Sequence, residues 1–305
     1  MDAPAVKPPL LPASLGRLGD VILLVKPGIT SMVLVATAFG YLLAGRGGAD
    51  WLHLAGVLMA TLLVGGGGNA LNQYLERDTD RLMARTRNRP LPAQRLRPGV
   101  ALWGGLGAGA LGLICLLALA NRWAAGVGLL VMVTYVLCYT PLKRVTVLNT
   151  LVGAIPGALP PVLGWVAAGG SLGRPVLALF MILYVWQLPH FLAIAWRYRG
   201  DYAAAGLPML PVSDALGTRT RRQLLVYSLT LVPVSLYPTV IGLSGTLYFY
   251  SAMTLSVLFL AIAARMVLRP TEAAATLLFR ASLLYLPLLL LIMFLDATPS
   301  FSWHP

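Results

Sequence analysis

The sequence predicts an all-α, polytopic membrane protein with about nine transmembrane helices. Charged residues make up only 11% of the chain and hydrophobic residues 58%, whereas a soluble domain usually carries about a quarter charged residues. Apolar runs of about 20 residues, the length that a helix needs to cross a bilayer, recur along the chain. Lipid is therefore the solvent that fits this composition.

The expected spans follow the apolar runs in order. The first begins after Lys26-Pro27, where proline suits an early helical position. The fourth is short, and the fifth contains Pro156, Pro160 and Pro161, which are tolerated in a membrane helix where it lines a cavity. The expected spans are 28–45, 51–75, 99–120, 123–140, 147–168, 175–196, 224–243, 248–267 and 278–296.

Lysine and arginine are distributed unevenly across this map. Arg46, Arg122 and Arg174 fall on one side, and the other 20 of the 23 basic residues (23 − 3 = 20) fall on the opposite side. The side rich in basic residues usually faces the cytoplasm. We therefore expect a multi-pass protein of the cell inner membrane with a cytoplasmic N-terminus and an outside C-terminus. The net charge of +13 then reflects topology and does not indicate nucleic-acid binding.

The chain is expected to form one transmembrane domain, residues 23–297, between an N-terminal cytoplasmic tail, 1–22, and a C-terminal tail, 298–305. Two connections on the cytoplasmic side are long, at about 76–98 and 197–223. Long loops on a rigid scaffold are where binding and catalytic residues concentrate. These two loops are therefore the expected cytoplasmic cap of the domain.

The first long loop opens with an acidic cluster. Asn72, Glu76 and Asp80 are spaced i, i+4 and i+8, which places them on one face of a helix, whereas Asp78 points away. Like charges four residues apart destabilise a bare helix, and charge is costly at a membrane edge. A bound cation would offset both costs, and an oxygen-only ligand set suits Mg²⁺.

A plainer interpretation is a solvated helix end whose acids pair with Arg77 and Arg81. The residues that follow favour the metal site, because six arginines occupy the next 17 positions: Arg81, Arg85, Arg87, Arg89, Arg95 and Arg97. Arginine binds phosphate through two parallel hydrogen bonds. Acids for a metal beside arginines for phosphate are the groups that a diphosphate leaving group requires.

Several motifs in order resemble the UbiA-type membrane prenyltransferases, and within them the protohaem IX farnesyltransferase (haem O synthase) branch. The resemblance covers about residues 20–215. It rests on Lys26-Pro27-x-Ile29-Thr30, Asn72-x-x-x-Glu76-x-x-x-Asp80, Met83-x-Arg85-Thr86-x-x-Arg89-Pro90-Leu91, Tyr139-Thr140-x-Leu142-Lys143-Arg144, Gly153-Ala154-x-Pro156-Gly157-Ala158-x-Pro160-Pro161-x-x-Gly164-Trp165, Trp186-Gln187-x-Pro189-His190-Phe191 and Asp201-Tyr202-x-x-x-Gly206-x-Pro208-Met209. Several motifs together are far more specific than any one of them.

The resemblance implies a ring of helices around a lipid-open central cavity under the cytoplasmic cap. It implies a farnesyl diphosphate substrate whose diphosphate binds at the cap through Mg²⁺. The metal would be held by Asn72, Glu76 and Asp80, with Asp201 as a further candidate ligand. The departing diphosphate would be neutralised by Arg85, Arg89, Lys143 and Arg199.

The resemblance also implies protohaem IX as the acceptor and haem O as the product. Many relatives with aromatic acceptors carry a second Asp-rich motif in the second loop, whereas this loop has only Asp201 and Asp214. The candidate acceptor residues are His190, Trp186 and Arg144. His190 is expected either to ligate the haem iron or to orient a water molecule. A haem A synthase or a terminal oxidase assembly protein is the implied partner.

Two alternatives remain at this point. A prenyltransferase of the same class could act on a quinone precursor or a chlorin, although the missing second Asp motif argues against it. A cation or proton transporter could use Glu76 and Asp80, but a transporter places ionisable residues near the middle of the bilayer. These two acids are expected at its cytoplasmic edge.

Overall fold

A computed structural model describes residues 13–45 and 48–297, and this part of the chain is almost entirely helical. One isolated β-bridge joins Ser244 and Ala297. The elements are α1 (Ala13–Leu24), α2 (Pro27–Gly45), α3 (Trp51–Asp80), α4 (Pro98–Cys115), the π-helix η1 (Leu116–Ala120), α5 (Arg122–Met132), the π-helix η2 (Val133–Tyr139), α6 (Thr140–Leu142), α7 (Asn149–Ala158), α8 (Pro160–Ala167), α9 (Arg174–Arg197), α10 (Arg199–Ala204), α11 (Leu210–Ser213), α12 (Thr218–Val240), α13 (Thr246–Leu268) and α14 (Glu272–Leu295).

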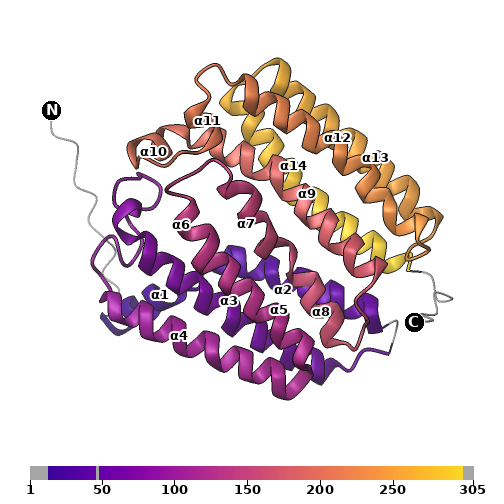
Figure 1. Ribbon diagram of the computed structural model, residues 1–305, viewed down its shortest axis with the longest axis horizontal. Helices are drawn as coiled ribbons and strands as arrows, with labels where there is room; N and C mark the ends of the chain where they lie inside the picture. The colour runs from indigo at the N-terminus through magenta and orange to yellow at the C-terminus, as the bar shows by residue number, and fades with distance from the viewer. Residues whose placement is uncertain (1–12, 46–47, 298–305) are drawn as a thin grey trace.

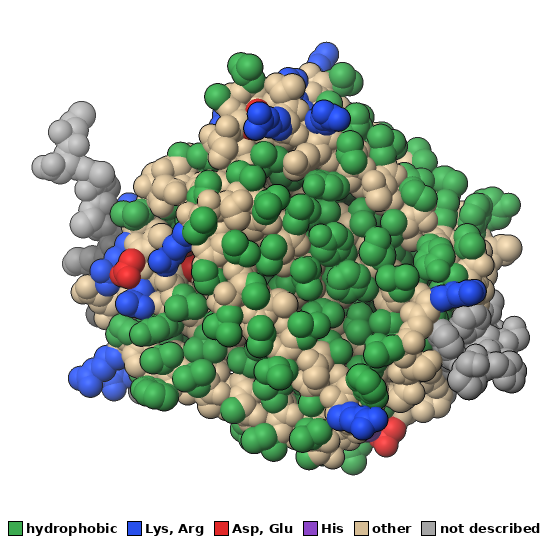
Figure 2. Space-filling model, viewed as in Figure 1, with side chains coloured by type: hydrophobic (Ala, Val, Ile, Leu, Met, Phe, Trp, Pro, Cys, Tyr) green, Lys and Arg blue, Asp and Glu red, His purple; other side chains and the backbone are tan. Residues whose placement is uncertain are grey.

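Nine helical segments within residues 13–45 and 48–297 are long and apolar enough to cross a membrane. They correspond one to one with the nine expected spans, so the predicted fold class is confirmed. Apolar side chains cover the broad middle of the face seen in Figure 2, and charged side chains gather at its margins. A surface of this kind suits a lipid environment, where an exposed charge is costly.

The order of the helices in space follows the chain. Neighbouring elements such as α2 and α3, α3 and α4, α12 and α13, and α13 and α14 pack together, and α14 returns to contact α2. Figure 1 shows α9 between the helices of the first part, α2–α8, and the helices α12–α14. The last span therefore closes on the first, which gives the ring-like arrangement that the family resemblance implies.

Glycine allows the closest approaches between these helices. A Cβ atom at Gly67 of α3 would lie 2.7 Å from the carbonyl oxygen of Gly105 in α4. A Cβ atom at Gly164 of α8 would collide with the carbonyl oxygen of Thr37 in α2. Small residues let membrane helices approach until their backbones touch, where dispersion forces are strongest.

Several elements differ from the expected spans, and α12 (Thr218–Val240) and α14 (Glu272–Leu295) each begin six residues earlier than expected (224 − 218 = 6; 278 − 272 = 6). Helix α3 continues beyond residue 75 to Asp80, so Glu76 and Asp80 belong to a regular helix and not to a loop. The fifth span is divided at Leu159 into α7 and α8, because Pro160 and Pro161 cannot donate backbone hydrogen bonds. Part of the expected N-terminal tail forms helix α1.

The two long connections, at about 76–98 and 197–223, meet and form a cap. The backbone N–H of Arg85 donates to Asp201 Oδ2 at 3.1 Å. Met83 from the first connection is buried in a small cluster with Tyr202, Leu207 and Met209 from the second. In Figure 1, α10 and α11 lie at the same end of the molecule as the loop that follows α3. Arg46 and the expected C-terminal tail, 298–305, lie outside the described residues, as do residues 1–12 of the N-terminal tail.

Candidate active site

The last turns of α3 bury the three residues that the sequence places on one face. Asn72, Glu76 and Asp80 are 1%, 4% and 0% exposed, whereas the Asp78 side chain is 66% exposed. The spacing of four residues explains this pattern, because each step turns the helix by about 40° past a full turn. Two carboxylates and one amide thus face the interior beneath the cap.

Each residue of this face is paired with a different basic side chain. Lys26 Nζ donates to Asn72 Oδ1 at 2.6 Å. Lys143 Nζ donates to Glu76 Oε1 at 2.9 Å, and Arg89 Nη1 donates to Asp80 Oδ2 at 2.8 Å.

The three cations come from different parts of the chain. Lys26 precedes α2, Arg89 lies in the loop after α3, and Lys143 follows α6. The alternative pairing with Arg77 does not occur here, since the guanidinium of Arg77 lies 3.8 Å from the exposed Asp78. The acids are therefore not a solvated helix end.

Lys26 is a site residue that the sequence reasoning missed. Its backbone has a positive φ of 53°, and its Nζ also lies 3.3 Å from the hydroxyl of Tyr135. Burial and, secondly, the positive charge of Arg89 lower the pKa of Lys26 to about 7. The available signal was its position immediately before Pro27, within one of the motifs that carry the resemblance.

Lys143 has the opposite electrostatic environment. Burial opposes its charge, but the neighbouring Glu76 carboxylate more than offsets this cost, so the pKa of Lys143 is raised above its usual range. Lys143 therefore stays protonated, and its ammonium group supplies a fixed positive charge beside Glu76. A fixed charge of this sign can stabilise a departing anion.

The oxygen atoms of the α3 face fit a hard divalent cation. Asp80 Oδ1 is buried and has no hydrogen-bond partner within the described part of the chain. Such an orphaned carboxylate oxygen is unusual unless a further ligand binds there. No group of three His, Cys, Asp or Glu residues gathers within residues 13–45 and 48–297, so the candidate set combines two carboxylates with the amide of Asn72. Asn72, Glu76 and Asp80 form an oxygen-only set of the kind that Mg²⁺ prefers.

The other predicted phosphate and metal ligands lie elsewhere in this conformation. The Arg85 guanidinium stacks 4.7 Å from the Tyr198 ring centre, and its Nη2 donates to Tyr202 Oη at 3.3 Å. Arg199 lies over the Trp196 ring, at 5.1 Å. Asp201 accepts the backbone N–H of Arg85. Arg85 and Asp201 therefore join the two cap loops to each other, whereas Arg199 stays within the second connection and the end of α9.

Arg144 also lies apart from the α3 face, because its guanidinium donates to the carbonyl oxygen of Leu75. Of the basic residues predicted at the diphosphate, the structure places Arg89 and Lys143 directly on the α3 face. It adds Lys26 to them.

The candidate acceptor residues Trp186 and His190 lie one turn apart on α9 and face α14. His190 is 9% exposed, and its Nδ1 lies 2.7 Å from Ser282 Oγ. Its ring stacks with Trp186 at 5.2 Å between ring centres. Gln187, which lies between Trp186 and His190 in the sequence, points to a different helix: its Nε2 donates to the carbonyl oxygen of Ala154 in α7 at 2.7 Å.

The π-helix η2 brings two further residues to the α3 face that sequence reasoning did not identify. Tyr135 donates to Asn69 Oδ1 at 3.1 Å, and its ring stacks with that of Tyr139 at 5.8 Å. Thr140, directly after η2, accepts from Asn72 Nδ2 at 3.0 Å. A π-helical turn shifts the side chains that follow it around the helix, so these contacts cannot be read from a regular 3.6-residue period.

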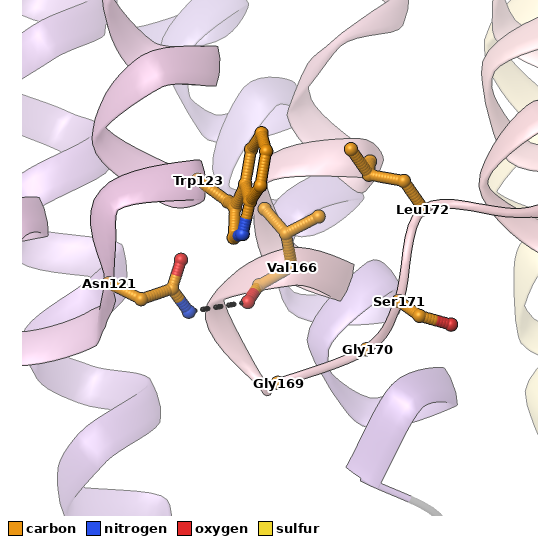
Figure 3. Close-up of a pocket in the computed structure, with 7 residues that line it drawn as sticks. All are labelled: Asn121, Trp123, Val166, Gly169, Gly170, Ser171 and Leu172. Atoms are coloured by element: carbon orange, nitrogen blue, oxygen red, sulfur yellow. Dashed lines mark hydrogen bonds between the residues drawn. The ribbon is translucent and has the colours of Figure 1, made fainter. Parts of the chain in front are cut away.

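A pocket of about 260 Å³ lies at the opposite ends of the helices. It is lined by Asn121, Trp123, Val166 and the loop 169–172 between α8 and α9. Figure 3 shows Asn121 donating across it to the carbonyl oxygen of Val166. The acidic face of α3 contributes nothing to this pocket, which is therefore separate from the candidate active site.

Comparison with known proteins identifies the family. Residues 33–295 match the UbiA prenyltransferase family. The chain belongs to this family. The UbiA-type chain is 43% identical over 286 residues to the protoheme IX farnesyltransferase of Solibacter usitatus, covering 91% of this chain and 98% of that protein. It is 41% identical over 284 residues to the protein of the same name from Myxococcus xanthus, covering 92% and 95%.

Solved structures of the UbiA family share the fold. A digeranylgeranylglyceryl phosphate synthase aligns with a TM-score of 0.77 at 19% identity and covers 92% of this chain and 98% of its own. A UbiA homolog from Archaeoglobus fulgidus, bound to DMAPP and Mg²⁺, aligns with a TM-score of 0.64 at 18% identity and covers 87% and 98%. At these identities the structures support the fold alone, and the multi-pass α-helical architecture is the family's own.

Proposed function

We propose that this chain transfers a farnesyl group from farnesyl diphosphate to a vinyl group of protohaem IX, with addition of water, giving haem O and diphosphate. The observation that carries the proposal is the buried Asn72, Glu76 and Asp80 face with one basic side chain on each residue. This face has the chemistry that a metal diphosphate requires. The acceptor is taken from relatives about 40% identical over most of their length that are named protoheme IX farnesyltransferase.

Charge balance supports a metal diphosphate as the ligand. Three cations, Lys26, Arg89 and Lys143, surround two carboxylates, so the face carries one net positive charge (3 − 2 = 1) when Lys26 is protonated. Farnesyl diphosphate with one bound Mg²⁺ carries roughly one net negative charge at neutral pH, and it would neutralise the site. Magnesium bound to Asn72, Glu76 and Asp80 would supply a bridge to the diphosphate oxygens and neutralise charge on the leaving group.

The residues of the chain then act on the leaving group. Lys26, Arg89 and Lys143 lie within hydrogen-bond distance of the α3 face, and they are free to donate to diphosphate oxygens once those oxygens compete for them. The C–O bond to the farnesyl carbon breaks, and its electron pair leaves with the diphosphate. Preorganised cations stabilise this developing charge without reorganising at the moment of reaction.

At the acceptor, the terminal carbon of the vinyl group attacks the allylic cation and forms the new C–C bond. Water then captures the positive charge at the adjacent carbon and loses one proton, which leaves a hydroxyethylfarnesyl side chain. Trp186 and His190 stack on each other, so His190 would meet a porphyrin through the edge of its ring, and Arg144 would offer a cation for a propionate. Exclusion of bulk water by the cap would protect the allylic cation before the vinyl group attacks.

The proposed setting is the cell inner membrane, with the N-terminus and the cap on the cytoplasmic side and the C-terminus outside. This orientation follows from the asymmetry of the basic residues. The proposed domain is residues 23–297, flanked by tails at 1–22 and 298–305. Haem O has to be passed on to an enzyme that oxidises or inserts it, so a haem A synthase or a terminal oxidase assembly protein is the proposed partner.

A product assay tests the proposal directly. The purified protein in lipid nanodiscs is incubated with protohaem IX, farnesyl diphosphate and Mg²⁺, and the pigments are separated and weighed by mass spectrometry. The expected product has the mass of protohaem plus one farnesyl group and one hydroxyl group. A parallel incubation replaces protohaem IX by a quinone precursor or a chlorin. Absence of the haem product, with farnesylation of one of these acceptors, would overturn the acceptor but keep the reaction class.

A further inference from the structure

Ser282 of α14 contacts both candidate acceptor residues of α9. Its hydroxyl oxygen lies 2.7 Å from His190 Nδ1, and its carbonyl oxygen accepts Trp186 Nε1–H at 2.9 Å. The Ser282 side chain is fully buried, at 0% exposure. One residue of the last span thus holds two residues of the sixth span, although nearly a hundred positions separate them in the sequence.

The hydrogen bonds of Ser282 determine which nitrogen of His190 carries the proton. The hydroxyl of Ser282 also lies 2.6 Å from the carbonyl oxygen of Phe279, and a carbonyl can only accept. A serine hydroxyl has one hydrogen, so this hydrogen is donated to Phe279. The Ser282 oxygen must then accept from His190 Nδ1–H. The neutral imidazole therefore carries its proton on Nδ1 and its lone pair on Nε2.

The ring of His190 is also fixed in orientation. It stacks with Trp186 on its own helix at 5.2 Å and 22° between ring planes, and with Phe279 of α14 at 5.2 Å and 30°. Together with the bond to Ser282, these contacts prevent the ring from turning over. No described residue forms a hydrogen bond with Nε2, so its lone pair is available to a ligand.

We propose that Ser282 is a positioning residue that holds His190 as the Nδ1–H tautomer and so presents Nε2 to the iron of the porphyrin acceptor. The part of this proposal that concerns the acceptor rests on the proposed function, whereas the tautomer does not. Histidine ligands of metals usually donate their other ring N–H to a neighbouring oxygen, which fixes the tautomer and raises the basicity of the ligand. Ser282 supplies that oxygen here.

Nitrogen NMR tests the tautomer without any substrate. The chain has only three histidines, so a sample labelled with ¹⁵N at histidine gives few signals, and His190→Ala identifies those of His190. The expected spectrum shows a protonated Nδ1 and an unprotonated Nε2. In Ser282→Ala the Nδ1 proton loses its acceptor, and the expected result is a shift of the signals toward the other tautomer. The opposite tautomer in the unmodified protein would overturn the proposal.

Haem titration tests the consequence for the acceptor. In Ser282→Ala the Kd for protohaem should rise about tenfold, the effect expected when a neighbour that orients a metal-ligating histidine is lost, and the absorption spectrum of bound haem should change. Ser282→Thr keeps the hydroxyl and should restore both. Ser235→Ala is the matched control, because Ser235 is equally buried but bonds to Tyr285. This control should bind haem like the unmodified protein.

The two experiments fail separately. Unchanged haem affinity and spectrum in Ser282→Ala would overturn the link to the acceptor, whatever the tautomer. An unmodified protein that shows the expected tautomer and its dependence on Ser282, but forms no farnesylated haem, would support the positioning role and overturn the proposed function.

Discussion

Lys26 and Asn72 are 46 residues apart in the sequence, yet Lys26 Nζ donates to Asn72 Oδ1 over 2.6 Å. This lysine occupies the amide oxygen that a bound metal ion would need. It lies directly before the first span, while Asn72 lies near the end of the second. A metal ion bound at Asn72 Oδ1 would compete with Lys26 for this oxygen, and a displaced Lys26 would have its ammonium group available for the diphosphate.

This exchange predicts opposite effects of Lys26→Met on the two ligands. Binding of Mn²⁺ alone, followed by electron paramagnetic resonance, should become tighter, because Asn72 Oδ1 is released and one repelling charge is removed. Binding of farnesyl diphosphate in the presence of the metal should weaken by about tenfold or more, because a hydrogen bond between charged groups contributes roughly 1.5–3 kcal/mol. A purely structural role for Lys26 predicts that both affinities fall together.

An exposed arginine provides the control for this change. Arg97 precedes α4, makes no capping hydrogen bond with its side chain, and lies outside the acidic face. Arg97→Met removes the same charge from the same end of the molecule and should leave both affinities unchanged. An equal loss of diphosphate affinity in Arg97→Met would indicate a general effect of net charge on an anionic ligand, and the specific role of Lys26 would be wrong.

A glycine substitution tests the close packing of the ring. Gly164→Ala should lower the thermal stability of the protein in detergent, because the added Cβ collides with the backbone of Thr37 and α2 has to move. Overpacking of this kind costs about 1–3 kcal/mol. Gly107→Ala is the matched control, since a Cβ at Gly107 meets nothing within 4 Å. Equal unfolding temperatures for the two variants would show that α2 and α8 are not tightly packed.

Much of the fold could be predicted from hydropathy because each span is a property of a continuous segment. The sixth span, expected at 175–196, is Arg174–Arg197 in the structure. Hydropathy ends the second span at residue 75, because the last turns of α3 carry the charged residues Glu76 and Asp80. Those turns remain helical because the cap buries them and basic side chains from other parts of the chain neutralise their acids. These are tertiary contacts, which the hydropathy of a local segment does not report.

Only those parts of the candidate site that lie within one helix could be predicted from the sequence. The common face of Asn72, Glu76 and Asp80 follows from helical spacing alone. The pairing of Lys26 with Asn72 joins separate spans, and no periodicity reports it. The same holds for Ser282, a single serine in an apolar helix whose importance depends on the arrangement of α9 and α14.

The proposed orientation can be tested with two exposed leucines at opposite ends of the molecule. Leu216 lies in the cap and is 85% exposed, and Leu172 lies in the loop between α8 and α9 and is 57% exposed. With Cys115 and Cys138 first replaced by Ala, Leu216→Cys should react with a membrane-impermeant maleimide only when the cytoplasmic face is opened. Leu172→Cys should react in intact spheroplasts. The reverse pattern would show that the basic side of the protein faces outward.

Asp80→Asn should abolish turnover, whereas Asp78→Asn should leave most of it. Both substitutions remove one negative charge from the same turn of α3 with almost no change in size. Asp80 is fully buried, its Oδ2 accepts from Arg89, and its Oδ1 is unpartnered within the described residues. In Asp80→Asn the side-chain amide replaces one carboxylate oxygen by an N–H₂ donor, which would face either Arg89 or the metal ion. Both the metal and the diphosphate should therefore bind poorly.

The Asp78 side chain is 66% exposed and has only a distant contact with Arg77, for which a loss of about 1 kcal/mol or less is expected. Turnover is measured as haem product formed per minute in nanodiscs, and circular dichroism checks that both variants keep their helices. We expect Asp80→Asn to fall by at least about a hundredfold, the scale on which loss of one preorganised charge contact acts. If both variants lose activity equally, the buried face of α3 does not hold the reacting diphosphate.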